Sequence, residues 1–553
     1  MLDADDEVQP GIPAHPAPEP LPAPPWLVAW LPALVAVLTG LPTLLYPFGR
    51  DQGNYAYAGW VMLEGGAPYS DVFIFKPPAT ALVHSVALGL FGVNMTAIRI
   101  LDLGWTALTA ATVALLAHRL LGKRDVALFA GVMVPLLYWQ VDYWNIAQTD
   151  GWLNLPCALA ILAVLVGGDV LPRSRLGALG LWTLAGVLAG VAVTFKYTAA
   201  ALGLPLLFAI GHVALHRGSR AWLAFPLLVL GGVIPLLSTW GWLVAVGGWD
   251  AFVDVQTELV PEYVRRTAKA RTAWQAIERL FSFNQHKIDV GILWYAGVAA
   301  WIPALAQGVL RGRRGLLAVG VVGSWWAVGV TSVLTQGKYY DYHYLPLLAP
   351  TALLLGMALP LVVGWVGGFM PRVVRWGVAG LALVGIIAVT PLGARFAEAA
   401  QVVSGARTWN AYLAGEGRYN YRDYDLDEQR QLVDWLRAET APDDHVFIWA
   451  FDPAIHIWAQ RRGTTRFLYN YPFRVAWGNP TYEAELMDGL RADPPEYVII
   501  ARGDHTYGVT GNKKDSETLF RQLRPFHDFV TSGYERATVQ GRYTVWRRKP
   551  GTD

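Results

Sequence analysis

The sequence predicts a polytopic α-helical membrane protein with about 11 spans, interfacial helices in the first outer loop and a C-terminal extracytoplasmic α/β domain. Of its 553 residues, 54% are apolar and only 16% are charged, well below the roughly 25% of a soluble globular chain. The long apolar runs lie within residues 26–392, whereas residues 393–553 have ordinary soluble composition. This shift predicts a transmembrane domain at 26–392 followed by a separate domain at 393–553.

Residues 1–25 precede the first apolar run and are rich in proline and alanine, with a small acidic cluster. They lack the positively charged start of a signal peptide, so we interpret them as a disordered cytoplasmic tail. The single cysteine, Cys157, lies inside an apolar run and therefore supports no disulfide framework.

Eleven apolar runs approach the ~20 residues needed to cross a bilayer. They are 26–47, 97–117, 125–141, 151–168, 176–195, 197–215, 221–247, 288–309, 315–334, 343–366 and 376–392. Between the first two runs lies Ala79–Phe91, which is short for a crossing and more typical of an interfacial or re-entrant segment.

Loop charge indicates that Ala79–Phe91 does not cross, because lysine and arginine concentrate in short cytoplasmic loops. Without that crossing, one face collects the basic residues of five short loops: Arg119, Lys123, Arg124, Arg173, Arg175, Arg217, Arg220, Arg311, Arg313, Arg314, Arg372 and Arg375. We therefore expect the N-terminus in the cytoplasm and the C-terminal domain outside. A prokaryotic plasma membrane is the expected location.

The long outer loop 248–287 departs from this pattern because it carries a basic cluster. The cluster consists of Arg265, Arg266, Lys269, Arg271, Arg279 and Lys287. One interpretation is binding of an anionic lipid headgroup or phosphate. The other is a solvated amphipathic helix in a loop long enough to escape the charge rule.

The C-terminal portion alternates helical and strand-like patterns. Helices are expected at Leu426–Ala438, Pro453–Gln460, Thr481–Arg491 and Ser516–Leu523, and strands at His445–Trp449, Glu496–Ile500 and Arg542–Arg547. No glycine-rich phosphate loop follows a strand. Asp443–Asp444 and Arg461–Arg462 are interpreted as turn residues rather than catalytic groups.

The first outer loop, 49–96, opens with Gly49–Pro78, which combines acids, bases and six aromatic residues. The predicted threading brings Asp51 from this loop to the same outer surface as Asp142 and Asp150. Lys76 and the stretch Lys338–Tyr344 lie at the same level. A carboxylate can take a proton from an acceptor hydroxyl, and cations can stabilise the charge on a departing phosphate.

Each candidate also has a structural explanation. Asp51 and Asp150 could cap helices, Lys76 could be a snorkelling anchor at the interface, and His343 could be an ordinary interface residue. The two prolines after Lys76 restrict its backbone, which favours a fixed position for this lysine. No metal-ligand spacing appears, so the sequence supports no bound metal and leaves assistance by a divalent cation open. Nothing points to a nucleic-acid partner.

Several stretches resemble the superfamily C glycosyltransferases, in the branch of the protein O-mannosyltransferases and the lipid A aminoarabinose transferase. The first outer loop, RDQGNYAYAGWVMLEGGAPYSDVFIFKPP, resembles the loop of this branch that ends in Lys-Pro-Pro. The similarity continues through NIAQTDGWLNLP, TFKYTAAALGLPLL and YHYLPLLAP. In character it covers most of the membrane half, although Gln-Thr-Asp stands here where relatives often have a Leu-Asp pair.

The resemblance implies an inverting transfer of a sugar from a polyprenyl-phosphate donor to a hydroxyl on a lipid, protein or glycan at the outer face. Carried over by position, Asp51 would be the general base or orienting carboxylate, and Asp150 would position acceptor or sugar. Lys76 would hold the donor phosphate, and Tyr344 or His343 would line the donor pocket. The loop with Arg265, Arg266 and Arg271 would lie above the cavity.

Two other classes of function remain open from the sequence. A lipid or sugar transporter, or flippase, would tend to place charged residues in mid-membrane and to show repeated spans. Here the spans hold few ionisable residues, Arg99 and Asp102 among them, and no repeat is visible. A non-catalytic scaffold would give Asp51 and Lys76 no role. Single substitutions at these two positions separate the three cases.

Overall fold

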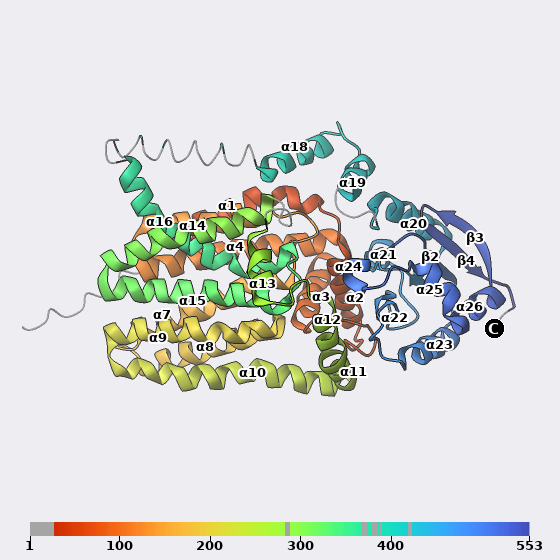
Figure 1. Ribbon diagram of the computed structural model, residues 1–553, viewed down its shortest axis with the longest axis horizontal. Coiled ribbons are helices and arrows are strands. Elements are labelled where there is room, and N and C mark those ends of the chain that lie inside the picture. The colour runs from red at the N-terminus through yellow and green to blue at the C-terminus, as the bar shows by residue number, and fades with distance from the viewer. Residues whose placement is uncertain are drawn as a thin grey trace, which may run out of the picture.

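The computed structural model of the chain describes residues 27–282, 288–367, 390–418 and 423–551, together with residues 371, 374, 377 and 385. Figure 1 shows long helices lying side by side in an elongated body, with a smaller domain of helices and strands at one end of it. The prediction of a polytopic helical protein with a C-terminal α/β domain is confirmed.

Within the described residues, nine helical segments are long and apolar enough to cross a membrane. They are α1 (Leu27–Gly40) with η1 (Leu41–Leu45), α4 (Met95–Leu121), α6 (Thr149–Trp152) with α7 (Asn154–Val170), α8 (Arg175–Phe195), η2 (Tyr197–Leu202) with α9 (Gly203–Arg217), η3 (Ser219–Leu223) with α10 (Ala224–Ala245), α14 (Ile288–Leu310), α15 (Gly312–Gln336), and η6 (Asp341–Leu347) with α16 (Leu348–Gly367).

The other two predicted spans differ in outcome. The run 125–141 forms α5 (Arg124–Tyr138), a helix of 15 residues that packs against α1, α4 and α16. The run 376–392 lies almost entirely outside the described residues. The ambiguous segment forms α3 (Ala79–Phe91), whose 13 residues span about 20 Å at 1.5 Å per residue, too short for the ~30 Å hydrocarbon core.

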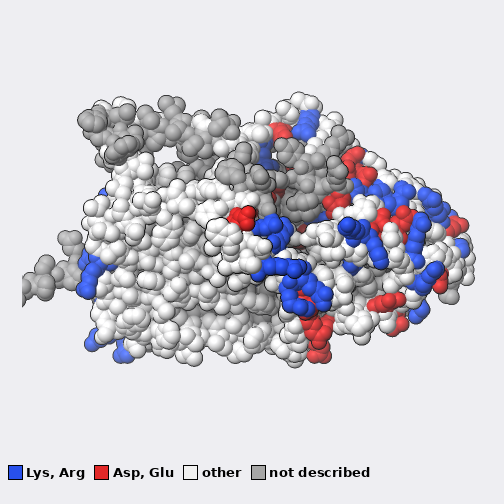
Figure 2. All heavy atoms as spheres, in the orientation of Figure 1, with Lys and Arg blue, Asp and Glu red and all other residues white. Residues whose placement is uncertain are grey.

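The basic loops meet at one end of the helical body, as the charge pattern predicts. At the C-terminal ends of α4 and α9, Arg119 and Arg217 both pair with Asp169 of α7. Between α14 and α15, Arg311 donates a hydrogen bond of 3.0 Å to the carbonyl of Leu121. Figure 2 shows basic residues at the end of the body far from the C-terminal domain, and an almost uncharged surface between the two ends.

The opposite end is built from short helices, as expected for the outer loops. The first loop forms α2 (Arg50–Leu63), which packs on α3. The long loop forms α11 (Trp249–Asp254), η4 (Val255–Leu259), α12 (Val260–Thr267) and α13 (Ala273–Phe281). Figure 1 shows α2, α11 and α12 next to the C-terminal domain.

The C-terminal domain contains a four-stranded sheet in the order β1-β2-β4-β3. The strands β1 (Val446–Trp449) and β2 (Tyr497–Ala501) are parallel and fully buried. The strand β4 (Tyr543–Arg548) pairs antiparallel with β2, and β3 (Tyr534–Gln540) pairs antiparallel with β4 at the edge of the sheet. The continuous apolar runs of β1 and β2 suit strands covered on both faces.

All four helices predicted in this domain are present, as α20 (Leu426–Glu439), α21 (Ala454–Ala459), α23 (Tyr482–Ala492) and α25 (Ser516–Gln522). The strand β3 and the helix α26 (Arg524–Gly533) were not predicted. The other helices after residue 390 in the described part of the chain are α18 (Pro391–Val403), α19 (Trp409–Arg418), α22 (Tyr471–Arg474) and α24 (Tyr507–Thr510).

The C-terminal domain is joined to the outer loops through buried contacts. The guanidinium of Arg50 donates to the carbonyl of Phe451 at 2.8 Å and to the carboxylate of Asp423 at 3.0 Å. Gly53 of α2 packs so closely on α21 that an added Cβ would lie 2.5 Å from the backbone nitrogen of Ala454. The C-terminal domain therefore packs directly against α2 at this end of the molecule.

Candidate functional site

A cavity of about 250 Å³, the first cavity, lies where the outer loops meet the C-terminal domain. Its walls come from α2, the Phe75–Pro77 segment, the junction of α8 and η2, α12, the end of α15, η6 and residues of the C-terminal domain. Its ionisable side chains include Arg50, Asp51, Lys76, Lys196, Lys338 and His343. Basic side chains outnumber the one carboxylate in this lining, which suits an anionic ligand.

Asp51 lies in the first turn of α2, where the helix dipole stabilises a carboxylate. It is not the helix cap, because Gly49 occupies that position and donates its backbone N–H to the side chain of Gln52 at 3.1 Å. The side chain of Gln148 donates to Asp51 Oδ2 at 3.4 Å. The capping explanation therefore fails, and Asp51 faces the cavity.

Lys76 is held by its surroundings rather than extended to solvent. Tyr69 donates its hydroxyl to the carbonyl of Lys76 at 2.8 Å. Its ammonium nitrogen lies 4.6 Å from the ring centroid of Tyr342 and 5.7 Å from that of Tyr55. This nitrogen is buried and has no hydrogen-bond partner among the described residues. A snorkelling lysine would expose its ammonium, so the structure favours a role in anion binding.

Asp150 contacts the cavity only through a residue that sequence reasoning missed. It is fully buried, lies in the first turn of α6 rather than at its cap, and pairs with Lys196. Lys196 lines the first cavity, whereas Asp150 lines neither this cavity nor the second one described below. Burial lowers the pKa of Lys196, and Asp150 opposes that shift. A lone lysine between two apolar runs was the available sequence signal.

The Lys338–Tyr344 stretch supplies three further residues of the first cavity, Lys338, Tyr342 and His343. Lys338 donates to the carbonyl of Tyr263 at 3.0 Å and to the hydroxyl of Thr267. Burial, followed by the nearby charge of Lys269, lowers the pKa of Lys338 to about 7. His343 lines the same cavity, and its Nδ1 has no hydrogen-bond partner within the described chain.

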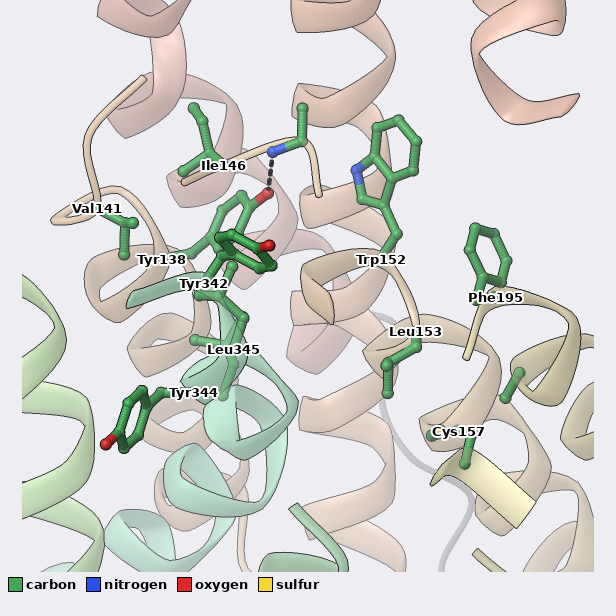
Figure 3. Close-up of a cluster of buried hydrophobic side chains, with 14 of the residues drawn as sticks. Tyr138, Val141, Ile146, Trp152, Leu153, Cys157, Phe195, Tyr342, Tyr344 and Leu345 are labelled. Atoms are coloured by element: carbon green, nitrogen blue, oxygen red, sulfur yellow. Dashed lines mark hydrogen bonds between the residues drawn. The ribbon is translucent and has the colours of Figure 1, made fainter. Parts of the chain in front are cut away.

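Tyr344 does not reach the cavity, which corrects one of the two candidates proposed for the donor pocket. It is fully buried and its ring centroid lies 6.2 Å from that of Trp294. Figure 3 shows the rings of Tyr342 and Tyr344 on separate sides of the η6 backbone. Tyr342, two residues earlier, lines the cavity instead.

The arginines of the long loop also lie outside the cavity lining. Arg265 and Arg266 both pair with Glu262, and their side chains are 68% and 47% exposed. Arg271 lines neither the first cavity nor the second cavity described below. The same helix turns Val260, Tyr263 and Val264 to the first cavity. The structure therefore matches the solvated amphipathic helix, not three phosphate ligands.

A second cavity of about 440 Å³ adjoins the first. The two share six lining residues: Arg50, Asp51, Tyr263, Tyr342, Phe451 and Val509. Asp51 thus lies where both cavities meet, and a ligand in either one can approach its carboxylate.

The third outer acid, Asp142, has a local role. Its Oδ1 accepts hydrogen bonds from the backbone N–H of Trp144 at 3.1 Å and the side chain of Asn145 at 2.8 Å. It lines neither cavity. In the C-terminal domain, Asp444 accepts a hydrogen bond from the backbone N–H of Ala441, as a turn residue does, whereas Arg461 donates to the backbone carbonyl of Thr440 and Arg462 lies 3.5 Å from Glu64.

Arg99 and Asp102, two ionisable residues near the start of α4, are also structural. Asp102 accepts from the hydroxyl of Tyr138 at 2.9 Å and from the indole of Trp152 at 2.6 Å. Arg99 donates to the carbonyl of Tyr143 at 3.1 Å. Tyr138 in turn accepts from the backbone of Ala147, the contact dashed in Figure 3.

Among the described residues, no group of three or more His, Cys, Asp or Glu side chains could hold a metal ion.

Part of the chain is similar in sequence to known proteins. Residues 75–244 match the family model described as dolichyl-phosphate-mannose-protein mannosyltransferase. Two curated relatives, both undecaprenyl phosphate-alpha-4-amino-4-deoxy-L-arabinose arabinosyl transferases from strains LESB58 and PAO1 of Pseudomonas aeruginosa, are 28% identical over 320 residues. The match covers 56% of this chain, and the chain spans about half, 55%, of each relative.

Two crystal structures of ArnT from Cupriavidus metallidurans have the same fold as this chain. One was solved bound to undecaprenyl phosphate and matches with a TM-score of 0.54 at 17% identity, covering 94% of this chain and 98% of that one. The other, in the apo state, matches with a TM-score of 0.56 at 16% identity, covering 93% and 97%. The resemblance to this branch of the superfamily C glycosyltransferases is thereby confirmed.

Proposed function

We propose that this chain transfers a sugar from a polyprenyl-phosphate donor to a hydroxyl acceptor at the outer face of the membrane. The observation that carries the proposal is the first cavity, which both Asp51 and Lys76 line, and in which the buried ammonium of Lys76 has no hydrogen-bond partner among the described residues. The relatives are named for undecaprenyl-phosphate-dependent sugar transfer, and an ArnT structure holds undecaprenyl phosphate. Both support the donor class.

The residues fit an inverting displacement. The acceptor oxygen forms a bond to the anomeric carbon of the donor sugar while the bond from that carbon to the phosphate oxygen breaks. The electron pair leaves with the phosphate, giving polyprenyl phosphate, and Asp51 takes the acceptor proton. Lys76, Lys196 and Lys338 line the cavity with positive charge that stabilises the leaving phosphate. Asp150 positions Lys196.

The proposed orientation places the N-terminus in the cytoplasm and both cavities outside. The five basic loops then face the cytoplasm, as the positive-inside rule requires. In this arrangement residues 26–392 form the transferase domain in the membrane. Residues 393–553 form an extracytoplasmic domain whose Phe451, Tyr469 and Tyr471 complete the first cavity.

A transporter without transferase chemistry is the alternative function. The ionisable residues of the first cavity gather at one end of the helical body rather than along a path through it, and Arg99 and Asp102 have structural partners. These placements favour the enzyme.

The test is turnover by the Asp51→Asn variant. Purified full-length protein is offered a panel of polyprenyl-phosphate sugars with lipid, peptide and oligosaccharide acceptors, and products are identified by mass. Loss of a general base lowers rates by about 10²- to 10⁴-fold, so Asp51→Asn should lose transfer while donor binding persists. Asp142→Asn, which keeps the oxygen that caps Trp144, should retain activity. Full turnover by Asp51→Asn would refute the assignment.

A further inference from the structure

The second cavity differs from the first in charge. Its lining includes two bases, Arg50 and Lys269, and three acids, Asp51, Asp341 and Asp423. Arg50 is already occupied, because it pairs with Asp423 at 3.0 Å and lies 3.7 Å from Asp452. A site with no surplus of positive charge offers little to a phosphorylated ligand, so a ligand here carries no phosphate of its own.

Aromatic rings surround this cavity on several sides. Trp144, Tyr340, Tyr342 and Phe451 line it, and Tyr507 of α24 stands at its rim with 58% of its surface exposed. Aromatic faces bury the apolar CH faces of a flat ring, while carboxylates accept hydrogen bonds from hydroxyl groups. A lining of aromatic rings with carboxylates beside them suits a saccharide, which has both apolar faces and hydroxyl groups.

Two buried hydroxyls of the lining have nothing to bind within the described chain. Tyr339 and Thr506 are 3% and 4% exposed, and neither hydroxyl has a hydrogen-bond partner there. Buried polar groups normally have partners, so these two point to a polar ligand. Tyr339 also adopts φ +54°, a strained conformation for a non-glycine residue that clusters at functional sites.

The loop carrying Tyr339 is held in place by the long outer loop. The backbone N–H of Lys269 donates to the carbonyl of Gly337 at 2.8 Å, and the side chain of Lys338 donates to the carbonyl of Tyr263 at 3.0 Å. These hydrogen bonds hold the segment that carries Tyr339 next to Tyr263, and Tyr263 lines both cavities.

We propose that the second cavity binds the acceptor, and that this acceptor is a neutral saccharide. The proposal builds on the sugar transfer inferred above: a hydroxyl of the bound saccharide reaches Asp51 at the junction of the cavities, gives it its proton and bonds to the donor's anomeric carbon. The volume of about 440 Å³ lies within the range of about 300–1,000 Å³ typical of small-ligand sites.

The test measures binding directly, without turnover. Full-length protein in nanodiscs is mixed with the methyl glycosides of glucose, galactose and mannose, with glucose 6-phosphate, and with a serine-containing peptide, and binding is followed by saturation-transfer NMR. At least one neutral glycoside should bind, and the phosphate and the peptide should bind more weakly. Absence of binding by every neutral glycoside, or preference for the phosphate or the peptide, overturns the proposal.

Matched variants locate the binding site. Tyr507→Ala removes an exposed ring and should weaken glycoside binding about three- to tenfold, the value of one aromatic contact, whereas Tyr507→Phe keeps the ring and should bind normally. Tyr339→Phe removes only the unpartnered hydroxyl and should also weaken binding. Unchanged binding in both Tyr507→Ala and Tyr339→Phe contradicts the assignment.

Donor binding separates this inference from the proposed function. Polyprenyl phosphate should bind Tyr507→Ala as tightly as the unmodified chain, because Tyr507 does not line the first cavity. If polyprenyl phosphate fails to bind the unmodified chain, the proposed function fails. If it binds and no neutral glycoside does, the acceptor assignment alone fails.

Discussion

The ammonium of Lys76 is buried and has no hydrogen-bond partner in the described part of the chain, and this combination is costly without a ligand. Lys76→Ala should weaken donor binding about 10- to 100-fold, because a hydrogen bond to a charged group contributes about 1.5–3 kcal/mol. The measurement is the dissociation constant of a polyprenyl phosphate in nanodiscs. Lys123→Ala, at the opposite end of the body, is the matched control and should bind normally. Equal affinity in both variants counts against the phosphate role.

Lys338 gives the site a dependence on pH. Because its pKa is lowered to about 7, its ammonium loses its proton as the pH rises through about 7, far below the ~10.4 of a free lysine. Only the charged form attracts the donor phosphate, so donor affinity should fall between about pH 6 and about pH 8. Lys338→Gln should bind more weakly at low pH and lose this dependence. An unchanged pH profile in the variant would contradict the role of Lys338.

Single residues were predictable where the signal was local. Asp51 and Lys76 stood out because they are charged residues within an aromatic loop, with two prolines after the lysine. The Asp150–Lys196 pair was not predictable, because it joins two segments that only the packed fold brings together. Tyr344, which was proposed with His343 for the donor pocket, does not line the first cavity. A tight helical turn sets which rings face the cavity, and periodicity in a short segment does not determine that turn.

The contact between α2 and α21 is tight enough to be tested by adding atoms. The side chain of Gly53→Val would clash with Ala454, because an added Cβ alone would lie 2.5 Å from the backbone nitrogen of Ala454. Overpacking of this kind costs about 1–3 kcal/mol, so the thermal midpoint should fall, and transfer with it. Gly104→Val in α4, where an added Cβ meets nothing within 4 Å, is the control. Equal midpoints in the two variants would show that this contact is loose.

Helices and strands could be predicted from the sequence where a continuous apolar run determines them. The long apolar helices and the buried strands β1 and β2 follow from continuous apolar runs. The strand β3 was missed because its sequence, YERATVQ, is largely polar and mostly exposed, and it is specified by pairing with β4. The helix α5 ends at Tyr138, before the end of the predicted run 125–141, because the last residues of that run belong to the loop that follows the helix.

At the scale of the whole molecule, the orientation in the membrane can be measured. In a Cys157→Ala background, Val539→Cys places a thiol on exposed β3, and Arg173→Cys places one among the basic loops. A membrane-impermeant maleimide added to intact cells should label position 539 and leave position 173 unlabelled until the cells are opened. Labelling of position 173 alone would invert the proposed topology.

The sequence predicted the arrangement of the two ends through the distribution of lysine and arginine, and the structure brings four of the five basic loops together as expected. It did not predict that the C-terminal domain would supply walls of both cavities. Those walls depend on buried contacts such as Arg50 with Asp423, which join residues far apart in the chain and leave no local pattern.

The assignment of the first cavity as the donor site is tested most directly by photo-crosslinking. A polyprenyl-phosphate sugar with a photoreactive group near its phosphate is irradiated with the full-length protein in nanodiscs, and the crosslinked peptides are identified by mass spectrometry. The account predicts crosslinks within residues 75–77, 195–198 and 336–343, which line the first cavity. Crosslinks confined to residues 119–124 or 311–314, at the other end of the helical body, would contradict it.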